Sequence, residues 1–295
     1  MTYISSAQAA KKWGISERSV RNYCSQGRVE GAFLSGKTWI IPDNAEKPVR
    51  NNARQVSITI KDILKREMDS RLSGGIYHRV QIELTYNSNH IEGSRLSHDQ
   101  TRYIYETNTI GITEEAANVD DIIETSNHFR CVDMIISNAD KMLTESFIKE
   151  LHKTLKIGTS DSRKDWFAVG EYKRFPNEVG GESTTPPEMV SAELRALISE
   201  YEHKSERTLD DIISFHAGFE RIHPFQDGNG RVGRLIMFKE CLRNNVVPFI
   251  IDESIKIPYY NGLKNWNSER GYLTSTCELA QDAFKKLLDY FQIKY

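Results

Sequence analysis

The sequence IHPFQDGNGRVGR, residues 222–234, places a histidine, a carboxylate, glycines and two arginines close together. Gly228 and Gly230 allow the backbone to turn sharply and to approach a ligand closely. The amides of such a loop, followed directly by a helix N-terminus, form a nest for anions. This stretch therefore predicts a loop that opens a helix and binds an anionic group.

The side chains of the same stretch supply the parts of a phosphate-transfer site. Arg231 and Arg234 are three residues apart, so both can face one anion from the first helical turn. Asp227 lies beside the predicted nest, and a hard carboxylate there suits Mg²⁺. His223 is the one side chain of the stretch that can take up a proton near neutral pH. Together they predict transfer of a phosphate-containing group.

Two other kinds of site are disfavoured by spacing. His216, Glu220 and His223 form His-x-x-x-Glu-x-x-His rather than His-Glu-x-x-His, and a third ligand is missing, which argues against zinc. The sequence also contains no Gly-x-x-x-x-Gly-Lys-Ser/Thr, the phosphate loop of P-loop kinases.

The stretch resembles the Fic-domain signature His-x-Phe-x-Asp/Glu-Gly-Asn-Gly-Arg-x-x-Arg at every fixed position, and the resemblance extends over roughly residues 60–291. It implies a mainly α fold: a helical Fic core with a small β-hairpin flap. It also implies a Mg²⁺-dependent protein adenylyltransferase, which moves AMP from ATP to a Ser, Thr or Tyr hydroxyl of a target protein or of itself. His223 would then be the catalytic base and Asp227 the metal ligand. The Doc-like branch, which transfers phosphate, has Lys where this chain has Gly230, so AMP transfer is favoured.

The resemblance also implies a set of nucleotide-binding residues. They come from the signature, from the flap and from a later helix: Gly228, Asn229, Gly230, Arg231, Arg234, Val179, Gly180, Gly181, Tyr259, Tyr260 and Asn267. The flap itself corresponds to GEYKRFPNEVGG, residues 170–181, where turn residues separate short extended runs and predict a hairpin. Its edge would hold the target chain by strand addition.

A second motif, NSNHIEG at residues 87–93, suggests inhibition. Gly93 is placed to cap a helix C-terminus, and Ser-x-x-x-Glu-Gly resembles the inhibitory motif of Fic proteins that carry it N-terminal to the active site. By that resemblance Glu92 pairs with Arg234, which would otherwise hold the γ-phosphate, and ATP binds unproductively. The same carboxylate could instead position a water for removal of AMP from a modified protein, so a de-AMPylase using the same site remains an alternative.

From about residue 57 onward the hydrophobic periodicity is mainly helical, which assigns residues 57–295 to the Fic domain with its N-terminal inhibitory helix. The predicted helices are Ile58–Leu72, Gly75–Ile91, Ser97–Glu106, Thr113–Ile136, Thr144–Leu155, Pro187–His203, Thr208–Ile222, Gly230–Asn244, Pro258–Asn267 and Tyr272–Phe291.

Residues 1–43 form a separate module by pattern: a helix over Ala7–Trp13, a second over Glu17–Gln26, and strands over Val29–Phe33 and Thr38–Ile41. The segment resembles the winged helix-turn-helix of the MerR/excisionase group, which implies binding to DNA. The residues implied are Arg18, Ser19, Arg21, Asn22 and, at the wing tip, Lys37. A small docking module with incidental charge is the alternative. Residues 44–56 are polar and are predicted to be a linker.

Composition agrees with two modules. The 295 residues carry 39 basic and 41 acidic side chains, a net charge of −2. Residues 1–50 hold eight Lys/Arg and four Asp/Glu, whereas the remainder holds 31 and 37. The N-terminus lacks a signal-peptide pattern, no apolar run could span a membrane, and the four cysteines are scattered, so we expect a cytoplasmic protein with no membrane partner. A nucleotide-sensing transcriptional regulator, as a homodimer on palindromic DNA, is the alternative from another class.

Overall fold

The structure is a computed structural model and describes residues 2–36, 38–48, 58–111 and 116–295. The chain divides into two compact units, residues 1–57 and 58–295, each of which is described by itself. Lys37 and most of the predicted linker lie outside the described residues.

The described residues of the N-terminal unit form two short helices and three strands: β1 (Tyr3–Ser5), α1 (Ser6–Trp13), α2 (Glu17–Ser25), β2 (Phe33–Ser35) and β3 (Thr38–Pro42). The strands form an antiparallel sheet in the order β1-β3-β2. Ser5 caps α1 in a capping box with Gln8, and Gly14 ends the helix in the left-handed region, at φ 66°. The two predicted helices are therefore confirmed.

One predicted strand in this unit has the wrong bounds, and one strand of the structure was not predicted. The strand predicted over Val29–Phe33 is a turn up to Ala32, whose amide donates to the carbonyl of Val29 (3.2 Å). Gly31 lies at φ 74°, so β2 begins only at Phe33. The missed strand, β1, is three residues long, too short to show an alternating pattern.

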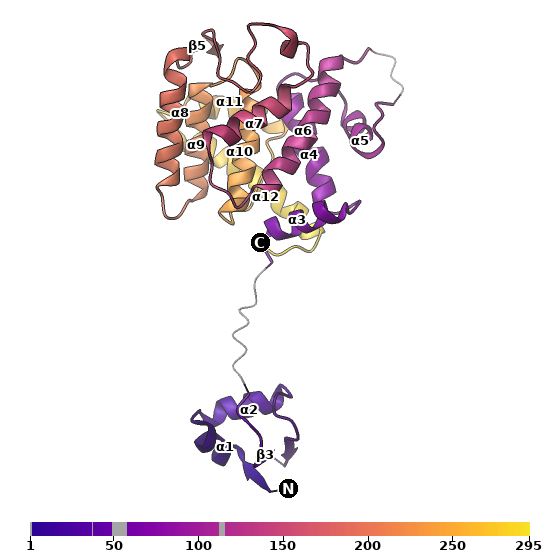
Figure 1. Ribbon diagram of the computed structural model, residues 1–295, viewed down its shortest axis with the longest axis vertical. Helices are drawn as coiled ribbons and strands as arrows, with labels where there is room; N and C mark the ends of the chain where they lie inside the picture. The colour runs from indigo at the N-terminus through magenta and orange to yellow at the C-terminus, as the bar shows by residue number, and fades with distance from the viewer. Residues whose placement is uncertain (1, 37, 49–57, 112–115) are drawn as a thin grey trace. The chain divides into compact units, whose positions relative to one another are not determined.

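The second unit is mainly helical (Figure 1). Its helices are α3 (Ile60–Ser70), α4 (Ile76–Ile91), α5 (His98–Thr107), α6 (Val119–Ser137), α7 (Glu145–Lys156), α8 (Pro187–Glu202), α9 (Leu209–Ile222), α10 (Asn229–Arg243), α11 (Lys256–Lys264) and α12 (Arg270–Tyr290), with short 3₁₀ turns at Asp161–Arg163 and Glu253–Ile255.

Helix α10 is the centre of this unit. It packs against α4, α6, α7 and α9, and side chains on all its faces are buried, from Asn229 to Leu242. A helix that is buried all round belongs in the core. Its N-terminus, which carries the signature loop, is therefore held by neighbouring helices, and α4 and α9 bring further side chains to it.

The predicted helices of this unit are confirmed within a few residues at each end, except one. Helix α6 begins at Val119 rather than at Thr113, because the Asn118 side chain caps it by accepting from the amide of Asp120 (3.0 Å). Residues 112–115 lie outside the described residues.

The flap is a hairpin, but it lies further along the chain than predicted. Its strands are β4 (Glu178–Val179) and β5 (Glu182–Ser183), joined by Gly180 and Gly181 at φ 60° and 82°. The predicted segment, residues 170–181, holds only the first strand and the turn, so the second strand was missed.

Within the described part of the chain, no helix is long and apolar enough to cross a membrane.

Candidate active site

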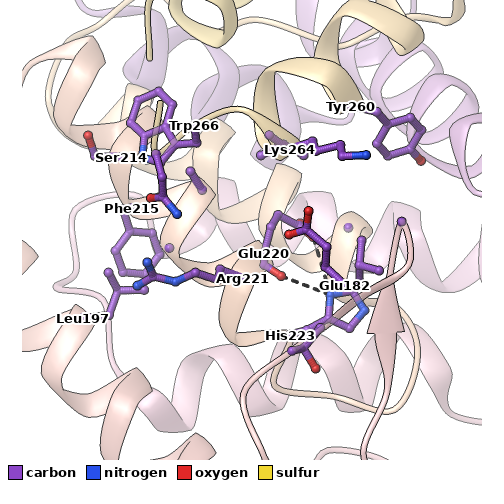
Figure 2. Close-up of a pocket in the computed structure, with 18 of the residues that line it drawn as sticks. Glu182, Leu197, Ser214, Phe215, Glu220, Arg221, His223, Tyr260, Lys264 and Trp266 are labelled. Atoms are coloured by element: carbon purple, nitrogen blue, oxygen red, sulfur yellow. Dashed lines mark hydrogen bonds and ion pairs between the residues drawn. The ribbon is translucent and has the colours of Figure 1, made fainter. Parts of the chain in front are cut away.

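A cavity of about 910 Å³ opens at the N-terminus of α10. It is bounded by the end of α4, the flap, α8, α9 and α11 (Figure 2). Many residues singled out from the sequence line it: Glu92, Val179, Gly180, His223, Gly230, Arg234, Tyr259, Tyr260 and Asn267. The fold thus brings together segments that are far apart in the sequence.

His223 sits at the point where α9 ends and the loop begins. Its backbone is in the left-handed region (φ 51°), an uncommon conformation for a residue with a side chain, and its amide donates to the carbonyl of Phe219 (2.9 Å). The ring Nδ1 lies 3.3 Å from the carbonyl oxygen of Glu220, which can only accept, so Nδ1 carries the hydrogen. Nε2 is then left with the lone pair that a base requires.

Burial lowers the pKa of His223 to about 4. The carbonyl of Glu220 opposes this shift, and the nearby positive charge of Lys173 adds to it. The imidazole is therefore neutral at neutral pH and able to accept a proton.

The loop between His223 and α10 is closed by Asn229. Its Oδ1 accepts from the amide of Phe225 and its Nδ2 donates to the carbonyl of the same residue, both at 2.8 Å. Gly228 lies at φ 83° and allows the turn. The buried side chain of Asn229 is thus used to shape the loop, and neither it nor Gly228 lines the cavity.

Asp227 belongs to a charge network that the sequence did not predict, in which its cationic partners are buried while its own side chain is half exposed. Its Oδ2 accepts from Lys156 Nζ (2.7 Å) and from Arg231 Nη2 (3.2 Å). Glu124 in α6 pairs with both of these cations. Burial by itself would raise the pKa of Asp227, but the charges of Arg231 and Lys156 outweigh it and hold that pKa well below its usual range. Lys156 and Glu124 are distant in sequence from the loop, and no motif marked them.

The carboxylate of Asp227 fits the requirements of a magnesium ion. No group of three or more His, Cys, Asp or Glu among the described residues could hold a metal by itself. Mg²⁺ in phosphate-transfer sites, however, is commonly held by one or two carboxylates together with substrate phosphates. Asp227 is ionised and its side chain is half exposed, so it can contribute such a ligand.

Glu92 and Arg234 form an ion pair in the cavity. Arg234 Nη2 donates to Glu92 Oε1 (2.7 Å) and to the carbonyl of Ser88 (2.9 Å), and its Nε donates to Ser88 Oγ (3.1 Å). Burial works against the charged form of Arg234, but the carboxylate of Glu92 overcomes this and raises the pKa of the guanidinium. Ser88 and Glu92 of Ser-x-x-x-Glu-Gly thus both bind Arg234, and Gly93, at φ 98°, follows at the end of α4.

Gly230 is required for this contact. A Cβ at position 230 would collide with Glu92 Oε1 and lie 2.9 Å from Arg234 Nη1. Arg234 Nη1 is buried and has no hydrogen-bond partner among the described residues. A buried donor without a partner is costly, which indicates a place for an anion.

The flap is held to the catalytic loop by Lys173. Its buried ammonium donates to Asn177 Oδ1 (2.7 Å), to Thr184 Oγ1 (2.6 Å) and to the carbonyl of Ile222 (3.2 Å). These bonds join both ends of the hairpin to the residue before His223. Burial lowers the pKa of Lys173 to about 8. In the sequence this residue is marked only by its place in the predicted flap.

The two tyrosines differ in position. Tyr259 is fully buried, and its hydroxyl lies 2.6 Å from His216 Nε2. Tyr260 is 39% exposed and faces the cavity opposite His223, near Lys264 (Figure 2). Lys264, Trp266, Arg221 and Glu220 also line the cavity, and the sequence did not assign them to the site.

The residues predicted to bind DNA lie on α2 of the N-terminal unit. Arg18, Arg21 and Asn22 are exposed, whereas Val20 and Cys24 face the core. Arg21 pairs with Glu17 (2.6 Å), and Ser19 Oγ lies 2.9 Å from Ser16 Oγ at the helix start.

Comparison with known proteins places this site in a known group. Residues 142–241 match the sequence model described as "Fic/DOC family". The match includes the signature loop and the flap, and it confirms the Fic domain predicted from the sequence.

Curated relatives include the "Protein adenylyltransferase Fic" of Aedes aegypti, 26% identical over 217 residues, and that of Drosophila mojavensis, 28% identical over 218 residues. These alignments cover 71% and 70% of this chain but 41% and 40% of the relatives. The chain thus spans about two fifths of the length of the curated relatives that it matches.

Solved structures show the same fold. A Fic-domain-containing signalling protein from Bacteroides thetaiotaomicron is 29% identical, with a TM-score of 0.58, over 78% of this chain and 90% of that one. Fic-1 from C. elegans, at 19% identity and a TM-score of 0.60 over 79% of this chain and 71% of that one, shares the fold.

Proposed function

We propose that this chain is a protein adenylyltransferase that transfers AMP from ATP to a hydroxyl side chain of a target protein, and that Glu92 inhibits it. The observation that carries the proposal is the convergence in one cavity of a neutral His223, the Arg234 guanidinium with an unpartnered N–H, and the Glu92 carboxylate. The relatives named protein adenylyltransferase support AMP transfer for the group.

In the proposed reaction His223 Nε2 takes the proton of the target hydroxyl. The hydroxyl oxygen then forms a bond to the α-phosphorus, and the bond from that phosphorus to the bridging oxygen of the β-phosphate breaks. AMP remains on the target, pyrophosphate leaves, and the proton resides on His223. The helix N-terminus at Gly230 and the guanidinium of Arg231 would stabilise the charge that develops on the phosphate.

Asp227 would hold Mg²⁺ beside the phosphates. When bound, Mg²⁺ would neutralise charge on the phosphates of ATP. Lys156 and Arg231 keep Asp227 ionised and fixed in place, so the carboxylate needs no rearrangement to act as a ligand.

The adenosine would lie against the α11 side of the cavity. The exposed ring of Tyr260 offers a face for the base, and Asn267 offers an amide for its edge or for the ribose. Val179 and Gly180 of the flap would cover the nucleotide from the other side. Strand addition along the short flap would present the target hydroxyl to His223.

Inhibition follows from the Glu92–Arg234 pair. Arg234 would hold the γ-phosphate, but Glu92 already occupies its Nη2 at 2.7 Å. A phosphate cannot make the same bidentate contact while the carboxylate is present. ATP would then bind with its α-phosphate misaligned for attack, which costs rate rather than binding.

The proposal is tested by labelling the full chain with ATP and Mg²⁺. ATP labelled on the α-phosphate should label the protein, whereas ATP labelled on the γ-phosphate should not. Label from the γ-phosphate alone would make the chain a kinase and contradict the proposal. Release of AMP from a pre-modified protein, without forward labelling, would favour the de-AMPylase.

For the N-terminal unit we propose binding to DNA as a winged helix-turn-helix, with α2 in the major groove. The support is the exposed row of Arg18, Arg21 and Asn22 on a helix whose opposite face is buried. A module with few basic residues makes few phosphate contacts, so its binding should weaken steeply with salt, and two copies would be needed for a palindrome.

Arg18→Ala should weaken binding of the full chain to a DNA fragment from upstream of its own coding sequence. The salt dependence of log K should become shallower by about one unit, because one phosphate contact is lost. Gel shift or fluorescence anisotropy at several salt concentrations measures both. Lys65→Ala, an exposed change on α3, serves as the control and should leave both values unchanged. Equal effects of the two variants, or no binding at all, would favour a docking module.

A further inference from the structure

Glu220 lies three residues before His223 on the last turn of α9, and both contact each other. Glu220 Oε2 is 3.8 Å from His223 Nδ1, the nitrogen that also donates to the Glu220 carbonyl oxygen. The side chain of Glu220 is only 11% exposed, at the edge of the cavity. Figure 2 shows the two residues joined in this way, while Arg221 turns away toward Phe215.

The space for this carboxylate is provided by α10. A Cβ at Gly233 would lie 2.7 Å from Glu220 Oε1 and 2.8 Å from the ring of His216. Glu220 Oε1 is buried and has no hydrogen-bond partner among the described residues. A carboxylate buried without full pairing destabilises the fold, so its presence beside the base calls for a functional reason.

We propose, on the basis of the proposed function, that Glu220 is a positioning residue for His223. Its backbone carbonyl accepts the Nδ1 hydrogen, and its carboxylate, 3.8 Å from Nδ1, stabilises the imidazolium that forms when Nε2 takes the proton of the target hydroxyl. When Glu220 is ionised, the proton taken from the target hydroxyl stays on His223, as in other carboxylate–histidine pairs. No proton is transferred to Glu220.

The charges around Glu220 tie this role to the inhibitory pair. Burial raises the pKa of Glu220 to about 8; Arg234 from α10 opposes this, and Glu92 from α4 adds to it. The other titratable groups described around the Glu220–His223 pair are His216 on α9, Lys173 at the base of the flap, Asp227 in the loop, and Tyr259 and Tyr260 on α11. At neutral pH Glu220 is therefore mostly protonated while Glu92 is charged. Loss of the Glu92 charge should favour the ionised form of Glu220, so inhibition would weaken the base as well as occupy Arg234.

The test uses the full chain with Glu92→Gly, so that activity is measurable. Adding Glu220→Gln should lower kcat for AMP transfer about 10- to 100-fold and leave KM for ATP within about twofold. The acidic limb of the kcat–pH profile should move to lower pH, because removing a negative charge beside an imidazolium lowers its pKa. Glu220→Asp, which keeps the charge, should retain the position of that limb.

The outcomes separate this proposal from the proposed function. If Glu92→Gly alone transfers no AMP, the proposed function fails. If it transfers AMP and Glu220→Gln leaves kcat and the acidic limb unchanged, the role of Glu220 fails. A lower kcat with a raised KM and an unmoved limb would indicate a purely structural residue, and would also overturn it. Glu150→Gln, an exposed change on α7, is the matched control, and circular dichroism checks that each variant is folded.

Discussion

Glu92→Gly should raise the rate at which the chain labels itself from α-labelled ATP by about 10- to 100-fold. In the present structure the Glu92 carboxylate accepts from Arg234 Nη2 at 2.7 Å, while Nη1 of the same guanidinium has no partner among the described residues. Removing the carboxylate frees one side of the guanidinium for a phosphate. The nucleotide can then adopt an alignment suited to in-line attack.

The effect should appear in kcat more than in the affinity for ATP. Misaligned and aligned ATP would share the adenosine contacts proposed at Tyr260, so the affinity for ATP measured by calorimetry should change little while labelling measured by autoradiography rises. Glu92→Gln separates charge from space: it keeps the length of the side chain but cannot form an ion pair, and it should reproduce most of the activation. Equal labelling of the wild-type chain and both variants would show that Glu92 does not inhibit.

His223→Ala, placed in the Glu92→Gly chain, should lower AMP transfer by about 10²- to 10⁴-fold, the range for loss of a general base. The ring Nδ1 is held by the Glu220 carbonyl at 3.3 Å, which leaves Nε2 as the proton acceptor. No other side chain of the signature loop can accept a proton near neutral pH. ATP binding should persist, because the phosphate contacts proposed for α10 and the loop do not involve the imidazole.

The measurement is initial-rate labelling together with calorimetric titration of ATP. His203→Ala, at the C-terminal end of α8, provides a histidine control that should keep full activity. Full activity in the His223→Ala chain would refute His223 as the base. Loss of both AMP transfer and ATP binding would instead indicate that the substitution disrupts the loop. Residue 223 also has a structural place there, because its amide donates to the carbonyl of Phe219.

Local sequence determined much of this protein. The signature at residues 222–234 predicted a loop that opens a helix, and that loop and α10 are present. Ser97 with Gln100 and Thr208 with Asp211 form capping boxes at the starts of α5 and α9, and such caps can be recognised in local sequence because they depend on residues only three positions apart. The predicted start of α6 was wrong because the helix begins where the Asn118 side chain caps it. Hydrophobic periodicity does not reveal the position of a single capping residue.

The tertiary structure alone decided which distant residues meet. Lys156, Glu124 and Lys173 come from three separate segments, and their side chains were ordinary surface charges by pattern; packing buried them against Asp227 and Ile222. The hairpin position also depended on packing, since Lys173 fixes both its ends. The burial of Glu220 beside His223 could not be predicted for the same reason: there is room for its carboxylate because Gly233 of α10 has no side chain at the point of contact. Sequence spacing determines which residues lie on the same helical turn. Burial and ion pairing between helices determine which of these residues are charged and which can act in the site.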